Sequence, residues 1–272
     1  MKNYISRVVG CLISIKFYKP IQNQINKYFV KLFKIDLTDF EPLDTYPSIQ
    51  RLFTRQLKKP RIFSLDTNTL ISPTDSTIAQ YGTLNKDLIL QIKGLSYDLY
   101  SFLTATANID QVKRIEDGSF INFYLSPRNY HRFHAPTDFE ITKTIHVPGT
   151  LYPVKQKSLE AQENLFIKNE RVILECHLKN NVCFYFVAIG AFNVGRITIN
   201  KETNLRTNTF DRKNLSAYNY SVPIQIKKGE EIGFFEMGSS VVLLFEKNKI
   251  KFCDNIHVGQ AVLFGDDFAK LF

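Results

Sequence analysis

Short apolar runs separated by turns dominate the chain from residue 71 onward. They predict β-strands, because they are rich in β-branched and aromatic side chains and are bounded by turn residues. The predicted strands are 88–92, 120–125, 172–176, 182–188, 194–199 and 241–245, with turns at Asp117-Gly118, Pro148-Gly149 and Lys228-Gly229. Short helices are predicted within 46–57, entered at Pro47-Ser48, and over 97–106. This pattern predicts an α+β fold with one mainly antiparallel β body over 46–272.

A helical pattern occupies the first 45 residues instead. Pro20 interrupts any helix there, and beyond it apolar residues recur at helical spacing while lysines fall on other faces. The apolar positions are Ile21, Ile25, Tyr28, Phe29, Leu32 and Phe33, and the lysines are Lys27, Lys31 and Lys34. The longest apolar run, 8–15, is too short to cross a bilayer, which needs about 20 residues. Residues 1–45 are therefore predicted to form an amphipathic helical segment.

Charge is distributed unevenly along the chain and bears on what this segment does. Of the formal charge of +9, the seven basic residues before Asp36 contribute +7, and no acidic residue precedes Asp36. Each lysine at an anionic membrane surface contributes about 1 kcal/mol, so we expect peripheral attachment to an anionic membrane. Packing of the helix on its own domain is the alternative. The nearly neutral remainder argues against a nucleic-acid partner.

Composition places the chain among ordinary globular proteins. Its 272 residues are 44% hydrophobic and 22% charged, which suits one large domain with a substantial core. The cysteines show neither zinc-finger spacing nor a C-x-x-C pair; they are Cys11, Cys176, Cys183 and Cys253. No cleavable signal peptide is recognisable, so reduced thiols in a cytosolic compartment are expected.

The tripeptide Gly238-Ser239-Ser240 precedes the strand predicted over 241–245 and is the first candidate for chemistry. Glycine and serine are typical of turns, because glycine allows φ > 0 and serine caps turns. The same pair can be a reactive bond, in which the Ser239 hydroxyl attacks the Gly238 carbonyl. On the tripeptide alone the turn is favoured.

Two histidines and one aspartate are the other candidates. His131 and His134 follow a predicted strand and lack a third ligand cluster, so no metal site is predicted. A histidine pair in a loop after a buried strand is more typical of a functional site. Asp75 either closes an Asx turn after Pro73 or orients a histidine that takes a proton from a hydroxyl.

Four segments, in order from about residue 45 to 265, resemble the phosphatidylserine decarboxylase family. Residues 51–58 resemble its F-x-R-x-L element, 72–78 its S-P-x-D-G-x-I segment, 124–136 its Y-L-x-P-x-D-Y-H-R-x-H-x-P segment, and 228–245 its L-G-S-T processing site. Asn169–Arg171 and Val187–Ala191 are weaker likenesses. Met237, Ser240 and Ser76 replace the family's usual leucine, threonine and glycine. The first two keep size or hydroxyl character, whereas Ser76 changes the local turn.

The resemblance implies an enzyme that makes its own pyruvoyl cofactor from Ser239. Asp75 would orient His134, His134 would deprotonate the Ser239 hydroxyl, and that oxygen would attack the Gly238 carbonyl. Ester formation and elimination would divide the chain into a β chain, 1–238, and an α chain, 239–272, that stay associated.

The substrate and partners are implied in the same way. The pyruvoyl group would form a Schiff base with the serine headgroup of phosphatidylserine and accept electrons during decarboxylation to phosphatidylethanolamine. His131 would handle the carboxylate or reprotonate the carbon. A homodimer on the cytoplasmic face of the cell membrane is also implied.

Two other classes of protein stay open. A serine hydrolase acting on lipids would use Ser239, His134 and Asp75, but it usually has a G-x-S-x-G elbow before a helix, and here a predicted strand follows. An unprocessed, inactive homologue acting as a membrane adaptor would explain the N-terminal segment but not the four ordered motifs.

Overall fold

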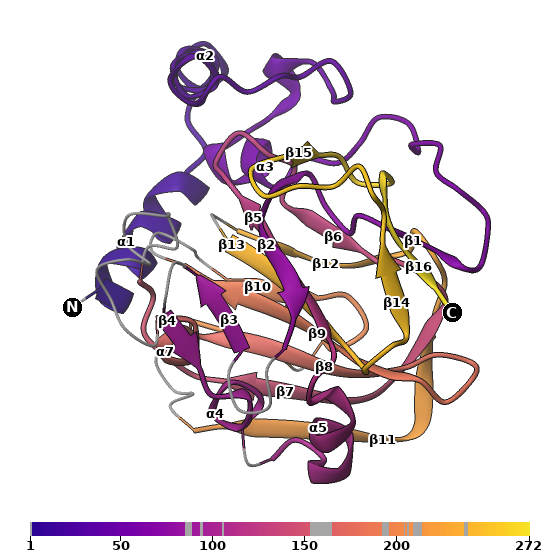
Figure 1. Cartoon of the computed structure of the whole chain (residues 1–272). Helices are drawn as coiled ribbons and strands as arrows, with labels where there is room; N and C mark the ends of the chain where they lie inside the picture. Colours follow the sequence, from indigo (N-terminus) through magenta and orange to yellow (C-terminus); the bar gives the residue numbers. More distant parts are fainter. Residues whose placement is uncertain are drawn as a thin grey trace.

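An antiparallel sheet of eight strands forms the body of the protein, in the order β11-β7-β8-β9-β13-β5-β2-β15. The computed structural model (Figure 1) describes residues 2–84, 89–92, 95–104, 106–152, 165–191, 196–203, 205, 207–208, 214–236 and 239–272. The strands of this sheet are β2 (Ser76–Thr83), β5 (Ser119–Leu125), β7 (Phe139–Val147), β8 (Arg171–His177), β9 (Cys183–Gly190), β11 (Ser216–Ile226), β13 (Ser239–Phe245) and β15 (Ala261–Val262). The predicted α+β fold with a mainly antiparallel body is confirmed.

The two central strands, β9 and β13, are buried along their whole length. They are nearly continuous apolar runs because both of their faces are covered. All seven residues of β13 pair with β5 on one side and with β9 on the other. The C-terminal part of the chain therefore supplies a central strand of the sheet.

Smaller sheets cover one face of the large sheet, and short helices cover the other. The smaller sheets are β10 (Ile197–Ile199)-β12 (Glu231–Phe235)-β6 (Arg132–His134) and β1 (Thr69–Ile71)-β16 (Asp267–Leu271)-β14 (Ile250–Phe252). The core on this side includes Phe133, Phe235 and Leu243. On the opposite side, α4 (Leu99–Leu103), α5 (Ile109–Ile115) and α7 (Leu165–Lys168) belong to one apolar cluster with Val242 and Leu244. Strands β3 (Ile89–Ile92) and β4 (Leu95–Tyr97) form a separate pair.

The N-terminal segment forms two helices, α1 (Lys2–Ser14) and α2 (Lys19–Phe33), at the edge of the molecule (Figure 1). Pro20 stands in the first turn of α2, where its missing N–H is no loss. The buried residues of α2 are the polar Gln22 and Asn26, and Asn26 Nδ2 donates a hydrogen bond to the Tyr46 carbonyl at 2.9 Å. Eight large apolar side chains of the segment are exposed, whereas Ile25, Phe29 and Phe33 are half-buried. The exposed ones are Val8, Leu12, Ile15, Phe17, Tyr18, Ile21, Tyr28 and Leu32. Thus the fully buried positions of α2 are polar, and part of its predicted apolar face stays exposed.

Neither α1 nor α2, nor any other helix in the described part of the chain, is long and apolar enough to cross a membrane. The short helix predicted within 46–57 is α3 (Ile49–Phe53), which follows a 3-10 turn (Leu43–Thr45) and is capped by Ser48. The helix predicted over 97–106 is shorter, because it begins only after β4. Ser239 and Ser240 begin a strand instead of forming a turn, and Met237 and Gly238 lie outside the described residues.

Candidate functional site

Ser239 begins β13 and lies between Leu125 of β5 and Gly190 of β9. Its side chain is fully buried, and its Oγ has no hydrogen-bond partner among the described residues. Alternation along the strand puts this side chain on the same face as Val241 and Leu243, which is the face covered by β6 and β12. A buried hydroxyl without a partner is unfavourable for stability, so its presence here calls for another explanation, such as a functional role.

Buried polar groups hold the strand beside Ser239 in place. Asn169 Nδ2 donates to the carbonyls of Gly190 at 2.9 Å and Tyr152 at 3.0 Å, and its Oδ1 accepts from the Tyr152 N–H at 3.0 Å. The Gly190 N–H donates to the Glu170 carbonyl at 2.8 Å. The motifs that the sequence indicated only weakly therefore meet at the end of β9, next to the candidate nucleophile.

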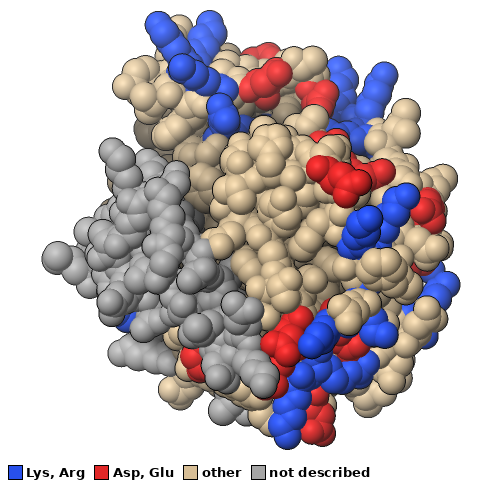
Figure 2. Space-filling view, in the orientation of Figure 1, with Lys and Arg blue, Asp and Glu red and all other residues tan. Residues whose placement is uncertain are grey.

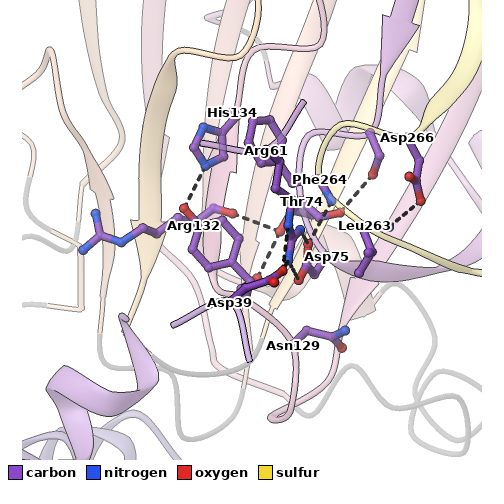
Figure 3. Close-up of polar contacts among 12 residues, drawn as sticks. Asp39, Arg61, Thr74, Asp75, Asn129, Arg132, His134, Leu263, Phe264 and Asp266 are labelled. Atoms are coloured by element: carbon purple, nitrogen blue, oxygen red, sulfur yellow. Dashed lines mark hydrogen bonds and ion pairs between the residues drawn. The ribbon is translucent and has the colours of Figure 1, made fainter. Parts of the chain in front are cut away.

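Asp75 is buried just before β2, and both of its carboxylate oxygens are engaged. Arg61 pairs with Oδ1 through Nη1 and with Oδ2 through Nη2 at 3.1 Å, while the Phe264 N–H donates to Oδ1 at 2.8 Å (Figure 3). Arg61 also pairs with Asp39 at 2.9 Å. Within the described structure, no hydrogen bond joins Asp75 to His134.

His134 is the last residue of β6 and is 6% exposed. Its backbone N–H donates to the Pro73 carbonyl at 2.8 Å, which puts it beside the segment that carries Asp75. Its Nδ1 lies 3.0 Å from the Gly229 carbonyl and must donate to it, so Nε2 carries the lone pair and accepts from the Tyr130 hydroxyl at 3.0 Å. Burial lowers the pKa of His134 to about 4, so the ring is neutral near pH 7 and can accept a proton.

His131 is fully buried, and the backbone pairing of β6 extends to it, since the Phe235 N–H donates to the His131 carbonyl at 2.9 Å. Alternation puts its ring with Phe133 on the face toward the large sheet, the layer that Ser239 also enters. Nδ1 lies 2.8 Å from the Asn129 carbonyl, and Nε2 has no partner in the described part of the chain. Burial lowers the pKa of His131 to about 3, so this ring is also neutral.

The register of the small sheet puts His131 and His134 beside opposite ends of β12, and the end beside His131 is the one that leads to Ser239. His131 pairs with the end of β12, four residues before Ser239, whereas His134 pairs with Glu231 at the start of β12. Since a strand rises about 3.3 Å per residue, the two histidine backbones are about 10 Å apart. The structure thus puts His131 and Ser239 in one layer and groups His134 with Asp75, and Ser239 Oγ bonds to neither histidine.

Several residues of this site were not predicted from the sequence. Arg61 and Phe264 stand outside the four motifs, and nothing in their local sequence indicates a role. Arg55 had a signal, because it belongs to the F-x-R-x-L element. It donates through Nη2 to the carbonyls of Arg128 and Asn129, at 2.8 and 3.0 Å, and so fixes the loop that leads to His131.

Among the described residues, neither the cavity at the β8–β9 turn nor a group of metal ligands extends the site. A cavity of about 470 Å³ opens at the β8–β9 turn, with Leu178 and Val182 in its wall. Phe184 pairs with Phe245 and Gly190 with Ser239, so this cavity lies at the opposite end of β13. No group of three potential metal ligands occurs among the residues that the structure describes.

Comparison with known proteins gives the family. The phosphatidylserine decarboxylase family profile matches residues 49–270. A phosphatidylserine decarboxylase proenzyme of Helicobacter pylori is 41% identical over 265 residues, which cover 96% of this chain and 97% of that protein. The proenzyme of Campylobacter jejuni is 37% identical over 97% of both chains, and that of Brevibacillus brevis is 30% identical over 98% of this chain and 94% of its own. The chain therefore belongs to the phosphatidylserine decarboxylase family.

Proposed function

We propose that this chain is a proenzyme that cuts itself between Gly238 and Ser239 and then converts phosphatidylserine to phosphatidylethanolamine. The observation that carries the proposal is the buried Ser239 hydroxyl, which has no partner among the described residues and lies in the segment that resembles the family's processing site. The names of the relatives, which are proenzymes of this activity, support both steps.

Ser239 is the proposed nucleophile and His134 the proposed base. Because the described structure gives Ser239 Oγ no bond to His134, the two side chains must approach each other before the proton moves. The Ser239 hydroxyl proton passes to His134 Nε2, the Oγ–C bond forms at the Gly238 carbonyl, and the C–N bond between the two residues breaks as that proton passes to the Ser239 nitrogen. The chain is then joined by an ester, and loss of the Ser239 α-proton with departure of the Gly238 carboxylate divides it. The neutral ring and the lone pair on Nε2 support this role. Because the Tyr130 hydroxyl is bonded to that nitrogen at 3.0 Å, this hydrogen bond must open before the proton moves. Asp75 is the proposed positioning residue for His134.

A pyruvoyl group derived from Ser239 fits this place, because the position is buried and its oxygen has no partner in the described residues. Such a group supplies an electron-accepting carbonyl for the decarboxylation. His131 is proposed to handle the substrate carboxylate or to return a proton to the carbon. Its unpaired, buried Nε2 in the same layer as Ser239 supports this role.

The pairing of β13 supports lasting association of the two products of the cut. Residues 239–245 form a ladder with β5 and another with β9. In the same C-terminal portion, β15 pairs with β2 and β16 pairs with β1. A fragment 239–272 would therefore remain part of the sheet.

Peripheral attachment to the cytoplasmic face of an anionic membrane is proposed for the N-terminal segment. The exposed Tyr28 and Leu32 and the buried Asn26 support it over packing of α2 by its apolar face. Figure 2 shows basic side chains at the end of the molecule where α2 lies, with acidic side chains close to them, above a broad area without charged side chains. We expect Leu32→Glu to reduce flotation with phosphatidylserine vesicles. Gln24→Glu, at an exposed polar position of the same helix, is the control for added charge.

Denaturing gel electrophoresis with intact-mass measurement tests the proposal. We expect two fragments, the smaller beginning at a blocked residue 239 and lighter by one ammonia than a peptide with an N-terminal serine. Ser239→Ala should stay uncut, whereas the control Ser240→Thr, which restores the family's usual residue, should be cut. A single active chain of 31.5 kDa, or normal cutting of Ser239→Ala, would overturn the proposal.

Variants of the histidines separate their two roles. His134→Ala should accumulate the uncut chain, and His131→Ala should be cut but should fail to release carbon dioxide from phosphatidylserine. The opposite pattern would exchange the two assignments. Release of fatty acid by an uncut chain would instead favour the lipid hydrolase.

A further inference from the structure

The aromatic ring of Phe264 lies directly on the imidazole of His134. The ring centroids are 3.9 Å apart and the planes are within 15° of parallel, which is a stacked arrangement. Phe264 is 5% exposed and belongs to a small apolar cluster with Phe40, Ile71 and Tyr130. Stacking fixes the plane of the imidazole, and the two hydrogen bonds at its nitrogens fix its rotation within that plane.

The backbone of Phe264 is in turn held by Asp75. The Phe264 N–H donates to Asp75 Oδ1 at 2.8 Å, and the next residue, Gly265, donates its N–H to the Ser72 carbonyl at 3.1 Å. The Ser72 N–H donates back to the Asp266 carbonyl at 2.7 Å. Gly265 has φ +102°, a conformation that L side chains rarely adopt, so this tight turn depends on glycine. Residues 264–266 are thus fixed to the segment that carries Asp75.

The geometry points to Phe264 as a positioning residue for His134, with Asp75 acting on the imidazole through Phe264 instead of touching it. The carboxylate of Asp75 is paired with Arg61, and its remaining hydrogen bond goes to Phe264. Both ring nitrogens of His134 are bonded elsewhere. The inference rests on the proposed function only in taking His134 as the base.

A consequence for the cut protein follows from the position of Phe264 in the chain. His134 and Asp75 precede the proposed cut after Gly238, whereas Phe264 follows it. The histidine of the larger fragment is therefore oriented by a ring of the smaller one. Loss of the smaller fragment would free the His134 imidazole to rotate even if strand β6, which carries His134, stayed folded.

Titration of His134 by NMR tests the inference, in the full-length Ser239→Ala chain so that cutting does not intervene. His134→Ala assigns its signals among the five histidines. The charged and titratable groups that act on the ring are Arg132 beside it, Glu231 on β12, Asp75 before β2 and the Tyr130 phenol. All of them remain in Phe264→Leu, so a change there reports the aromatic ring alone.

We expect Phe264→Leu to reduce the ring-current displacement of the His134 carbon-bound protons, leaving the part due to Tyr130, whose ring is also stacked on the imidazole with centroids 5.7 Å apart. Its pKa should rise from about 4 toward the ordinary 6.5, because water gains access to the ring. Phe63→Leu is the matched control, since Phe63 packs on Phe264 with centroids 5.9 Å apart and belongs to the same cluster. It should leave both signals nearly unchanged. If Asp75 positions the ring through Phe264, adding Asp75→Ala to Phe264→Leu should change the ring-current displacement little further.

Unchanged His134 signals in Phe264→Leu, or equal changes in the Phe63→Leu control, would overturn the inference. An unchanged ring-current displacement of the His134 signals in Asp75→Ala would also contradict it, because the Phe264 N–H loses its acceptor in that variant. These results do not depend on cutting. Failure of wild-type cutting with the expected NMR changes would instead refute the proposed function and leave the positioning of His134 intact.

Discussion

Replacement of Asn169 by alanine should weaken the fold where it supports the proposed nucleophile. The Asn169 side chain is fully buried and makes three hydrogen bonds, two with Tyr152 and one with the carbonyl of Gly190. Each such bond contributes about 1 kcal/mol net, and a buried group left without a partner costs about 1–3 kcal/mol. Because Tyr152 is only partly buried, water can replace part of the hydrogen bonding that its backbone loses in this variant. We expect Asn169→Ala to lower the free energy of unfolding by about 3 kcal/mol.

Urea unfolding of the full-length Ser239→Ala chain measures this change without interference from cutting. The midpoint should fall while the slope with denaturant stays constant, which distinguishes lost stability from a changed unfolded state. For a chain of this length, a loss of about 3 kcal/mol corresponds to a melting temperature lower by roughly 5 °C. In the otherwise wild-type chain, we expect slower cutting, because Gly190 pairs with Ser239.

Asn219→Ala is the matched control, since Asn219 is an exposed position of β11. A surface substitution of this kind usually changes stability by less than about 0.5 kcal/mol. A loss below about 1 kcal/mol in Asn169→Ala, or a loss equal to that of the control, would refute the view that these hydrogen bonds fix the end of β9.

Three further predictions concern buried groups near the site. Since burial lowers the pKa of His134 from 6.5 to about 4, its contribution to stability is complete above pH 6.5 and is lost as the pH falls toward 4. This loss is about 3 kcal/mol, and His134→Gln should make the pH dependence of denaturant unfolding shallower by that amount, while the buried His131 still contributes in the same range. Ser76→Ala should raise the free energy of unfolding by up to about 1 kcal/mol, because the buried Ser76 Oγ has no partner among the described residues; equal or lower stability would contradict this. Arg132→Lys should lower the free energy of unfolding by about 2 kcal/mol, because lysine cannot reproduce the paired hydrogen bonds to Glu231 at 2.8 and 2.9 Å. An unchanged unfolding midpoint would show that this ion pair does not stabilise the fold.

The periodicity of the chain predicted the central strands well, because they are apolar on both faces and short. Val241–Phe245 is a clear strand in the sequence, and β13 only adds Ser239 and Ser240 to it. These two serines were harder to predict, because glycine and serine favour turns locally. Pairing with both neighbouring strands, a contact between segments far apart in sequence, overrides that preference.

The candidate site was predictable only where residues fall in a recognisable motif. Motifs indicate which residues belong together, but they do not reveal the hydrogen-bond partners of each side chain. Asp75 was expected to orient His134 directly, whereas its carboxylate contacts Arg61 and Phe264, which lie in segments without a motif. The exposure of Leu32 could not be predicted either, since helical spacing shows that a face is apolar but not which side of the helix meets the protein.

The position of Ser239 explains how a chain could break one bond and keep its shape. The residue begins the strand with the most complete pairing in the large sheet, and the next five side chains after Ser240, Val241–Phe245, are all fully buried. Burial of each such side chain contributes about 1.5–3 kcal/mol, so pulling β13 out of the sheet would cost on the order of 10 kcal/mol. The cut proposed before Ser239 would therefore free a chain end at the edge of the site while the strand behind it stays fixed. A group formed at position 239 would be held by the same two ladders that hold the serine, in the layer that His131 enters.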